Sequence, residues 1–155
     1  MPLLRAALSW NFVLATAICA SLLAQLIKVL LNLFIFHRFI AERMWGAGGM
    51  PSSHSATVCA MVVATGRYCG VNSPIFAIAA VLSLTFMDDA MGVRYETGEQ
   101  AKVLNRMFTE WMDQGFEQFQ LPHGKKLKEM VGHTPIEVVT GAALGIVLGF
   151  AMPMV

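Results

Sequence analysis

Charged side chains are scarce in this chain. Asp, Glu, Lys and Arg make up 14% of its 155 residues, whereas hydrophobic residues make up 56%. A soluble domain typically carries about 25% charged residues, so there is too little polar surface here to cover a water-soluble globule. A chain of this length is about one domain. We therefore expect a single membrane domain that spans residues 1–155.

Two further shortages exclude other classes of protein. The net charge is only +1, so no basic field favours a nucleic acid as partner. The cysteines number three, lie in or beside apolar runs, and form no CxxC pair or Cys/His cluster. This pattern argues against a disulfide scaffold and against a zinc site. The three residues are Cys19, Cys59 and Cys69.

Long apolar runs predict an all-α integral membrane protein. We expect about four transmembrane helices, at about residues 8–36, 52–68, 74–91 and 135–155. In the last of these, Gly141, Gly145 and Gly149 recur every four residues, a spacing that suits close helix packing in lipid.

The long polar loop of residues 92–132 contains a predicted amphipathic helix at about residues 97–119. Its apolar stripe is suited to lie on the bilayer surface or against the ends of the other helices. An ordinary stripe packed on the rest of the protein is the alternative. The stripe comprises Ala101, Leu104, Met107, Phe108, Trp111 and Met112.

Polar residues also interrupt the first apolar run. Ser21, Gln25, Lys28 and Asn32 are spaced to share one helical face. A polar face inside a membrane helix contacts protein or a water-filled cavity, because contact with lipid is unfavourable. Lys28 alone is also explained by snorkelling toward the nearer helix end.

Basic residues predict the orientation. With four crossings, the loops of residues 37–53 and 92–132 share one side and hold eight Lys and Arg, whereas the other side holds only Arg5 and Arg67. The positive-inside rule then places the two polar loops in the cytoplasm of a bacterium, or on the stromal or matrix side of an organelle membrane. The eight are Arg38, Arg43, Arg94, Lys102, Arg106, Lys125, Lys126 and Lys128.

Two short stretches on that side carry chemically useful groups. A glycine-rich turn leads into a helix start with Ser52, Ser53 and His54, and free N–H groups make such a start an anion site. The second stretch has His133 four residues before Glu137. A carboxylate bonded to one ring nitrogen leaves the other free as a nucleophile. The structural alternatives are a capping box for Glu137, an N-cap for either serine, and structural histidines.

Four motifs together resemble the divergent, short branch of the type 2 phosphatidic acid phosphatase superfamily, over about residues 28–149. They are Gly48, Gly49, Met50, Pro51, Ser52, Ser53, His54, Ser55 and Ala56; Asp89, Ala90, Met91, Gly92, Val93 and Arg94; Gly98, Glu99, Gln100 and Ala101 with Leu104 and Asn105; and Gly132, His133, Thr134, Pro135, Ile136, Glu137 and Val138 with Gly141.

The resemblance implies a role for each matched residue. His133 attacks phosphorus to form a phosphohistidine, Glu137 orients it, and His54 protonates the leaving oxygen. The resemblance implies no metal and no other cofactor. The residues implied to bind the phosphate oxygens are Lys28, Gly49, Ser52, Ser53 and Arg94.

The chain also departs from the superfamily pattern. Ser53 stands where the superfamily has glycine, Glu137 where it has aspartate, and a long insert separates Arg94 from His133. Two functions follow as hypotheses. One is a membrane phosphatase that acts on a lipid phosphate or diphosphate. The other is a non-catalytic relative that binds anionic lipid headgroups or serves as a small subunit of a larger membrane complex.

Overall fold

The computed structural model describes residues 11–36, 49–114, 126–129 and 131–154, and within these ranges it contains helices and no strands. The all-α class is thus confirmed. The helices, in chain order, are α2 (Phe12–Phe36), α4 (Ser53–Cys69), α5 (Pro74–Met91), α6 (Val93–Asp113) and α7 (Pro135–Ala151).

The outer faces of α2, α5 and α7 are apolar. Among the described residues, α2 and the stretch that begins with α5 are long and apolar enough to cross a membrane, and α7 is apolar but shorter. Large side chains such as Leu22, Ile78 and Val147 are about two-thirds exposed. Such a surface suits contact with lipid, where the helices satisfy their own backbone hydrogen bonds. Four crossings remain a prediction.

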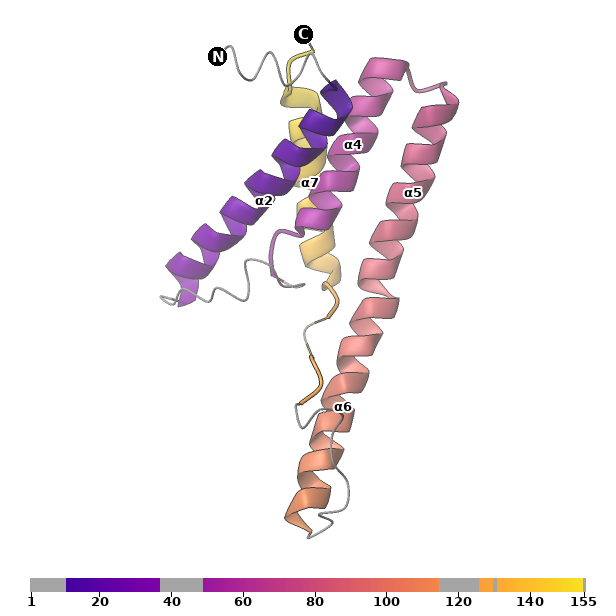
Figure 1. Ribbon diagram of the computed structural model, residues 1–155. Helices are drawn as coiled ribbons and strands as arrows, with labels where there is room; N and C mark the ends of the chain where they lie inside the picture. Colours follow the sequence, from indigo (N-terminus) through magenta and orange to yellow (C-terminus); the bar gives the residue numbers. More distant parts are fainter. Residues whose placement is uncertain (1–10, 37–48, 115–125, 130, 155) are drawn as a thin grey trace.

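Helix α4 lies at the centre of the bundle and contacts α2, α5 and α7 (Figure 1). Its core with α2 is built from alanines, Ala20 and Ala24 against Ala56 and Ala60, with two leucines of α7 packed beside them. Small side chains allow helix backbones to approach closely, which is a main source of helix association in lipid.

The three glycines of α7 face α4 directly. A Cβ atom added to Gly141 or Gly145 would collide with the carbonyl oxygen of Ser52 or Ala56, and one added to Gly149 would meet the side chain of Val63. The predicted close packing is confirmed. It also holds the start of α7 against the start of α4.

Replacing Gly145 with alanine is therefore expected to destabilise the bundle. The added methyl group must push α7 away from the Ala56 carbonyl, and overpacking of this kind costs about 1–3 kcal/mol. Thermal unfolding in detergent measures the effect. Ala143→Val is the matched control, because it also enlarges a side chain of α7 but on an exposed face. Equal unfolding temperatures for the two variants would contradict this packing.

Arg67 joins α4 to α7 at the other end of this helix pair. Its guanidinium donates to the carbonyl oxygens of Gly149, Phe150 and Met152 at 2.6–3.0 Å. The last carbonyls of a helix lack partners inside the helix and carry partial negative charge, so a cation there satisfies both needs. Arg67 therefore has a structural task in joining α4 to the end of α7.

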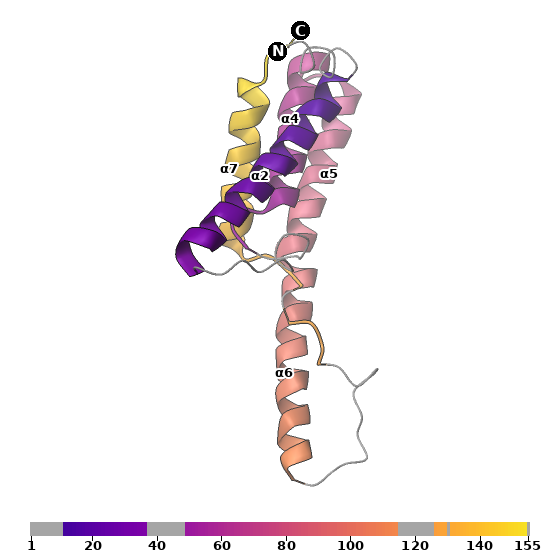
Figure 2. The same ribbon diagram turned by 60° about the vertical axis from the view of Figure 1, so that its left-hand side comes forward.

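Helix α6 follows α5 with only Gly92 between them, and extends beyond the bundle (Figures 1 and 2). It begins four residues before the predicted amphipathic helix, and residues 115–119 of that prediction lie outside the described residues. The side chains of Leu104 and Met107 are exposed, whereas the smaller Ala101 and Asn105 are buried. The interpretation of the stripe as an internal packing face is thus wrong for Leu104 and Met107, whereas Phe108 is half-buried.

The smaller residues of α6 are covered by the segment that leads to α7. The side-chain amide of Asn105 donates to the carbonyl of Leu127 and accepts from its N–H, both at 2.9 Å. A Cβ atom on Gly98 would collide with the carbonyl oxygen of Glu129. The Asn105 amide also donates to the Glu129 carboxylate at 2.8 Å. The segment otherwise packs by its backbone, and close backbone contact requires small residues on the helix. Placement of α6 on the bilayer surface remains a prediction.

Candidate functional site

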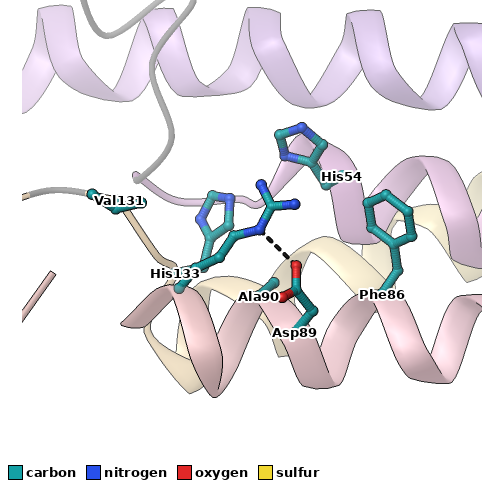
Figure 3. A pocket seen from close by; sticks show the side chains of 7 residues that line it. His54, Phe86, Asp89, Ala90, Val131 and His133 are labelled. Atoms are coloured by element: carbon teal, nitrogen blue, oxygen red, sulfur yellow. Dashed lines mark hydrogen bonds and ion pairs between the residues drawn. The ribbon is translucent and has the colours of Figure 1, made fainter. Parts of the chain in front are cut away.

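A small pocket lies at the end of the bundle where α4 and α7 begin and where α5 gives way to α6. Figure 3 shows two histidine rings facing the stretch of α5 that carries Phe86, Asp89 and Ala90. The first turn of α4 supplies one ring, and the segment before α7 supplies the other. The lining residues are His54, Phe86, Asp89, Ala90, Arg94, Val131 and His133.

His133 is buried and is held at two points. Its backbone N–H donates to the carbonyl of Ala90 at 3.1 Å, and its Nδ1 lies 3.2 Å from the Oε2 atom of Glu137. Its Nε2 atom is buried and has no hydrogen-bond partner in the described part of the chain. A carboxylate that accepts from Nδ1–H leaves a lone pair on Nε2. Within the described residues, the site thus presents the buried Nε2 of His133 without a hydrogen-bond partner.

Burial also favours the neutral form of this ring. The pKa of His133 lies below its usual value of 6.5, mainly because burial disfavours the charged imidazolium. The positive charges of Lys28 and Arg94 act in the same direction, whereas the bond to Glu137 opposes them. At neutral pH the imidazole is therefore uncharged, as a nitrogen nucleophile must be.

Glu137 joins three segments through its two carboxylate oxygens. Oε2 faces His133 Nδ1 and also accepts from the N–H of Thr134 at 3.1 Å. Oε1 accepts from the N–H of Gly49 at 3.1 Å. Glu137 therefore caps α7 and contacts His133 at once. The capping box is confirmed, and the catalytic role of Glu137 remains a prediction.

Gly49 was implied to bind phosphate, and this role remains a prediction. In this structure its backbone N–H donates to Glu137. Its backbone has φ = +92°, a conformation that L side chains rarely adopt, and the stem of Lys28 packs against it at 3.4 Å from where a Cβ would stand. Gly49 thus permits the turn that brings Lys28 and Glu137 together.

The serines of the turn have separate positions. Ser52 is fully buried and caps α4, because its hydroxyl accepts from the N–H and the hydroxyl of Ser55. Its own N–H donates to the carbonyl of Glu137 at 3.0 Å. Ser53, the first residue of α4, is also buried. The N-cap alternative is therefore correct for Ser52, and His54 follows directly on the first turn.

The predicted residues gather at this end of the bundle. The ring centroids of His54 and His133 are 5.9 Å apart. Lys28 is only 2% exposed and its charge interacts with Glu137, so it faces the protein interior and does not snorkel. Arg94 lines the pocket and forms an ion pair with Asp89 at 2.6 Å. The phosphate-binding and catalytic roles of these residues remain predictions.

Four lining residues received no role from the sequence. Asp89 and Ala90 stand within one of the four motifs, which is the one signal that could have indicated them; Phe86 and Val131 lie outside the motifs. Among the described residues, no three His, Cys, Asp or Glu side chains come together to hold a metal ion.

Comparison with known proteins identifies the family of this chain. Residues 9–148 match the model of the divergent PAP2 family. The chain is also 38% identical over 144 residues to the uncharacterized membrane protein YuiD of Bacillus subtilis (strain 168), across 89% of this chain and 91% of that protein. No solved structure matches. The resemblance drawn from the four motifs is confirmed, and the chain belongs to the divergent PAP2 family of membrane proteins.

Proposed function

We propose that this protein is a membrane phosphatase that hydrolyses a lipid phosphate or diphosphate through a phosphohistidine on His133. One observation carries the proposal: His133 is buried with Nδ1 held by Glu137, while Nε2 has no partner in the described residues. The same pocket contains His54 as a proton donor and Arg94 as a cation.

The reaction proceeds in two steps. Nε2 of His133 attacks phosphorus, the bond from phosphorus to the leaving oxygen breaks, and that oxygen takes a proton from His54. Water then attacks the phosphohistidine. His54 accepts a proton from this water, the nitrogen–phosphorus bond breaks, and inorganic phosphate leaves. Both histidines return to their starting states.

Charge and surroundings support this chemistry. Phosphoryl transfer depends mainly on positioning and on stabilisation of the phosphoryl oxygens. Lys28 and Arg94 bring positive charge to the two rings, and the start of α4 adds the positive end of a helix dipole. Phe86 and Val131 give the pocket an apolar part, which suits a phosphate attached to a lipid.

Purified protein in detergent tests the function directly. Inorganic phosphate release is measured from a panel containing a lysophosphatidic acid, a phosphatidic acid, a phosphatidylglycerol phosphate and an isoprenyl diphosphate. We expect release from at least one of these lipids. Binding of the same lipids without release from any would instead support the non-catalytic alternative.

Replacing His54 with glutamine is expected to separate substrates by leaving group. Release from an alkyl lipid phosphate falls by about 10²–10⁴-fold, because the alkoxide leaves unprotonated. With p-nitrophenyl phosphate the first step survives, since nitrophenolate needs no proton to leave, and the second step becomes slow. Rapid mixing should then show a burst of nitrophenolate. Equal losses on both substrates, with no burst, would contradict the role of His54.

We place the site on the cytoplasmic or stromal face, because the loops at that end carry eight Lys and Arg and each translocated charge opposes the membrane potential. The test uses a variant without native cysteines that carries Gln114→Cys at the end of α6. We expect a membrane-impermeant thiol reagent to label it only after permeabilisation. Val71→Cys, in the α4–α5 turn, is the matched probe and should label in intact cells. The reverse pattern would refute this orientation.

A further inference from the structure

Asp89 is a negative charge in a pocket that is proposed to bind an anion. Its carboxylate lines the pocket with His54 and His133 (Figure 3), and its side chain is 39% exposed. A carboxylate at such a place weakens anion binding by direct repulsion. Asp89 therefore needs a compensating effect on anion binding, exerted through a neighbouring residue.

That neighbour is Arg94, and a local interruption of helical geometry between the two residues brings the pair together. Residues five apart point about 140° from each other around a regular helix of 3.6 residues per turn. Here Gly92 leaves helical geometry, with φ = −94° and ψ = −93°. The Nε atom of Arg94 then lies 2.6 Å from Oδ2 of Asp89, shown as the dashed line in Figure 3.

The same interruption at Gly92 positions His133, the proposed nucleophile. Interruption of the helix leaves the carbonyl of Ala90 to accept the backbone N–H of His133 at 3.1 Å. A Cβ atom on Gly132 would collide with the backbone of Tyr95, so the His133 segment lies directly against the start of α6. Arg94 and His133 are thus placed relative to one another by one short stretch of chain.

The contact with Asp89 uses one edge of the guanidinium group. Arginine has five N–H donors in a rigid, planar fork. Within the described residues, Arg94 donates to Asp89 through Nε, and no other hydrogen bond from its side chain is present there. The two terminal nitrogens retain their donors, and such a pair binds two oxygens of a phosphoryl group together.

We propose that Asp89 is a positioning residue, which holds Arg94 by Nε so that its two terminal nitrogens bind two oxygens of a phosphoryl group. The inference rests on the proposed function only in the identity of the anion. It makes a prediction opposite in sign to simple electrostatics: loss of the Asp89 carboxylate should weaken phosphate binding.

The experiment is calorimetric titration of the purified full chain with inorganic phosphate. Asp89→Ala should weaken phosphate binding about tenfold, because Arg94 loses its fixed orientation. Asp89→Asn keeps an acceptor oxygen for Nε and should retain the affinity of the wild type. Asp88→Ala is the matched control, since it removes the adjacent carboxylate of the same helix end, which does not line the pocket. It should leave binding unchanged or slightly tighter.

A second background tests whether Asp89 acts through Arg94. In an Arg94→Gln protein, Asp89→Ala should have no further weakening effect. The inference is overturned if Asp89→Ala binds phosphate as tightly as the wild type, if Asp88→Ala weakens binding equally, or if the Asp89→Ala effect persists without Arg94. Phosphate binding that depends on Asp89, in a protein that hydrolyses none of the lipids, would refute the phosphatase proposal alone.

Discussion

Replacing His133 with alanine is expected to abolish phosphate release, with a loss of at least about a thousandfold. The variant lacks Nε2 of His133, the one protein atom that bonds to phosphorus in the proposed mechanism. The two-step reaction cannot occur, and only direct attack by water remains. Initial rates of phosphate release from the best lipid substrate measure the effect. Lipid binding should survive, since Lys28 and Arg94 remain in place.

The control for this prediction is Thr85→Ala. Thr85 lies on an exposed face of α5, and its hydroxyl bonds to the Val81 carbonyl of its own helix. It should keep the activity of the wild type. Thermal unfolding of both variants shows whether the fold is intact. A folded His133→Ala protein with more than about a tenth of normal activity would contradict the assignment of the nucleophile.

Replacing Glu137 with glutamine is expected to lower activity by about 10³–10⁴-fold. The carboxylate accepts from three donors, on His133, Thr134 and Gly49. A carboxamide offers one acceptor oxygen and an NH₂ group, so at least one of these donors loses its partner. It also supplies no negative charge opposite the imidazolium that forms when Nε2 bonds to phosphorus. Loss of a carboxylate that supports a catalytic histidine has effects of about this size.

The Glu137→Asp variant distinguishes the effect of the negative charge from the effect of side-chain length. It keeps the negative charge but has a shorter side chain, so it cannot serve both the Gly49 turn and His133 at the present geometry. We expect its activity to exceed that of Glu137→Gln by at least about tenfold, because the charge matters most. Rates and unfolding temperatures are measured for both. Full activity in a folded Glu137→Gln protein would show that Glu137 only caps α7.

Much of the fold was predictable because its signals are local. Apolar runs of membrane length, the Ser52 cap and the glycine stripe of α7 each depend on residues close together in sequence. The helix starts that carry His54 and His133 were predictable for the same reason. Alternation of helix direction then places both starts at one end of the bundle, where the structure has them 5.9 Å apart.

The features that escaped prediction depend on non-local backbone geometry. The stripe of α6 suited either the bilayer surface or an internal packing face. Of its members only Ala101 is buried; Gly98 and Asn105, outside the stripe, are buried because the segment before α7 contacts them. Asp89 escaped because helical periodicity does not pair it with Arg94. The two residues are paired only because Gly92 departs from helical geometry. A single glycine between two helical stretches does not specify such a departure.

A phosphoryl group carried on Nε2 of His133 can be trapped on the protein. The purified protein is mixed with a ³²P-labelled lipid phosphate, denatured within milliseconds and digested. We expect label that is stable in alkali and labile in acid, on the peptide containing His133; with ³²P-labelled p-nitrophenyl phosphate, whose leaving group needs no proton, labelling should be stronger in the His54→Gln variant. Hydrolysis of the lipid with no labelled peptide, or with label on another residue, would contradict it.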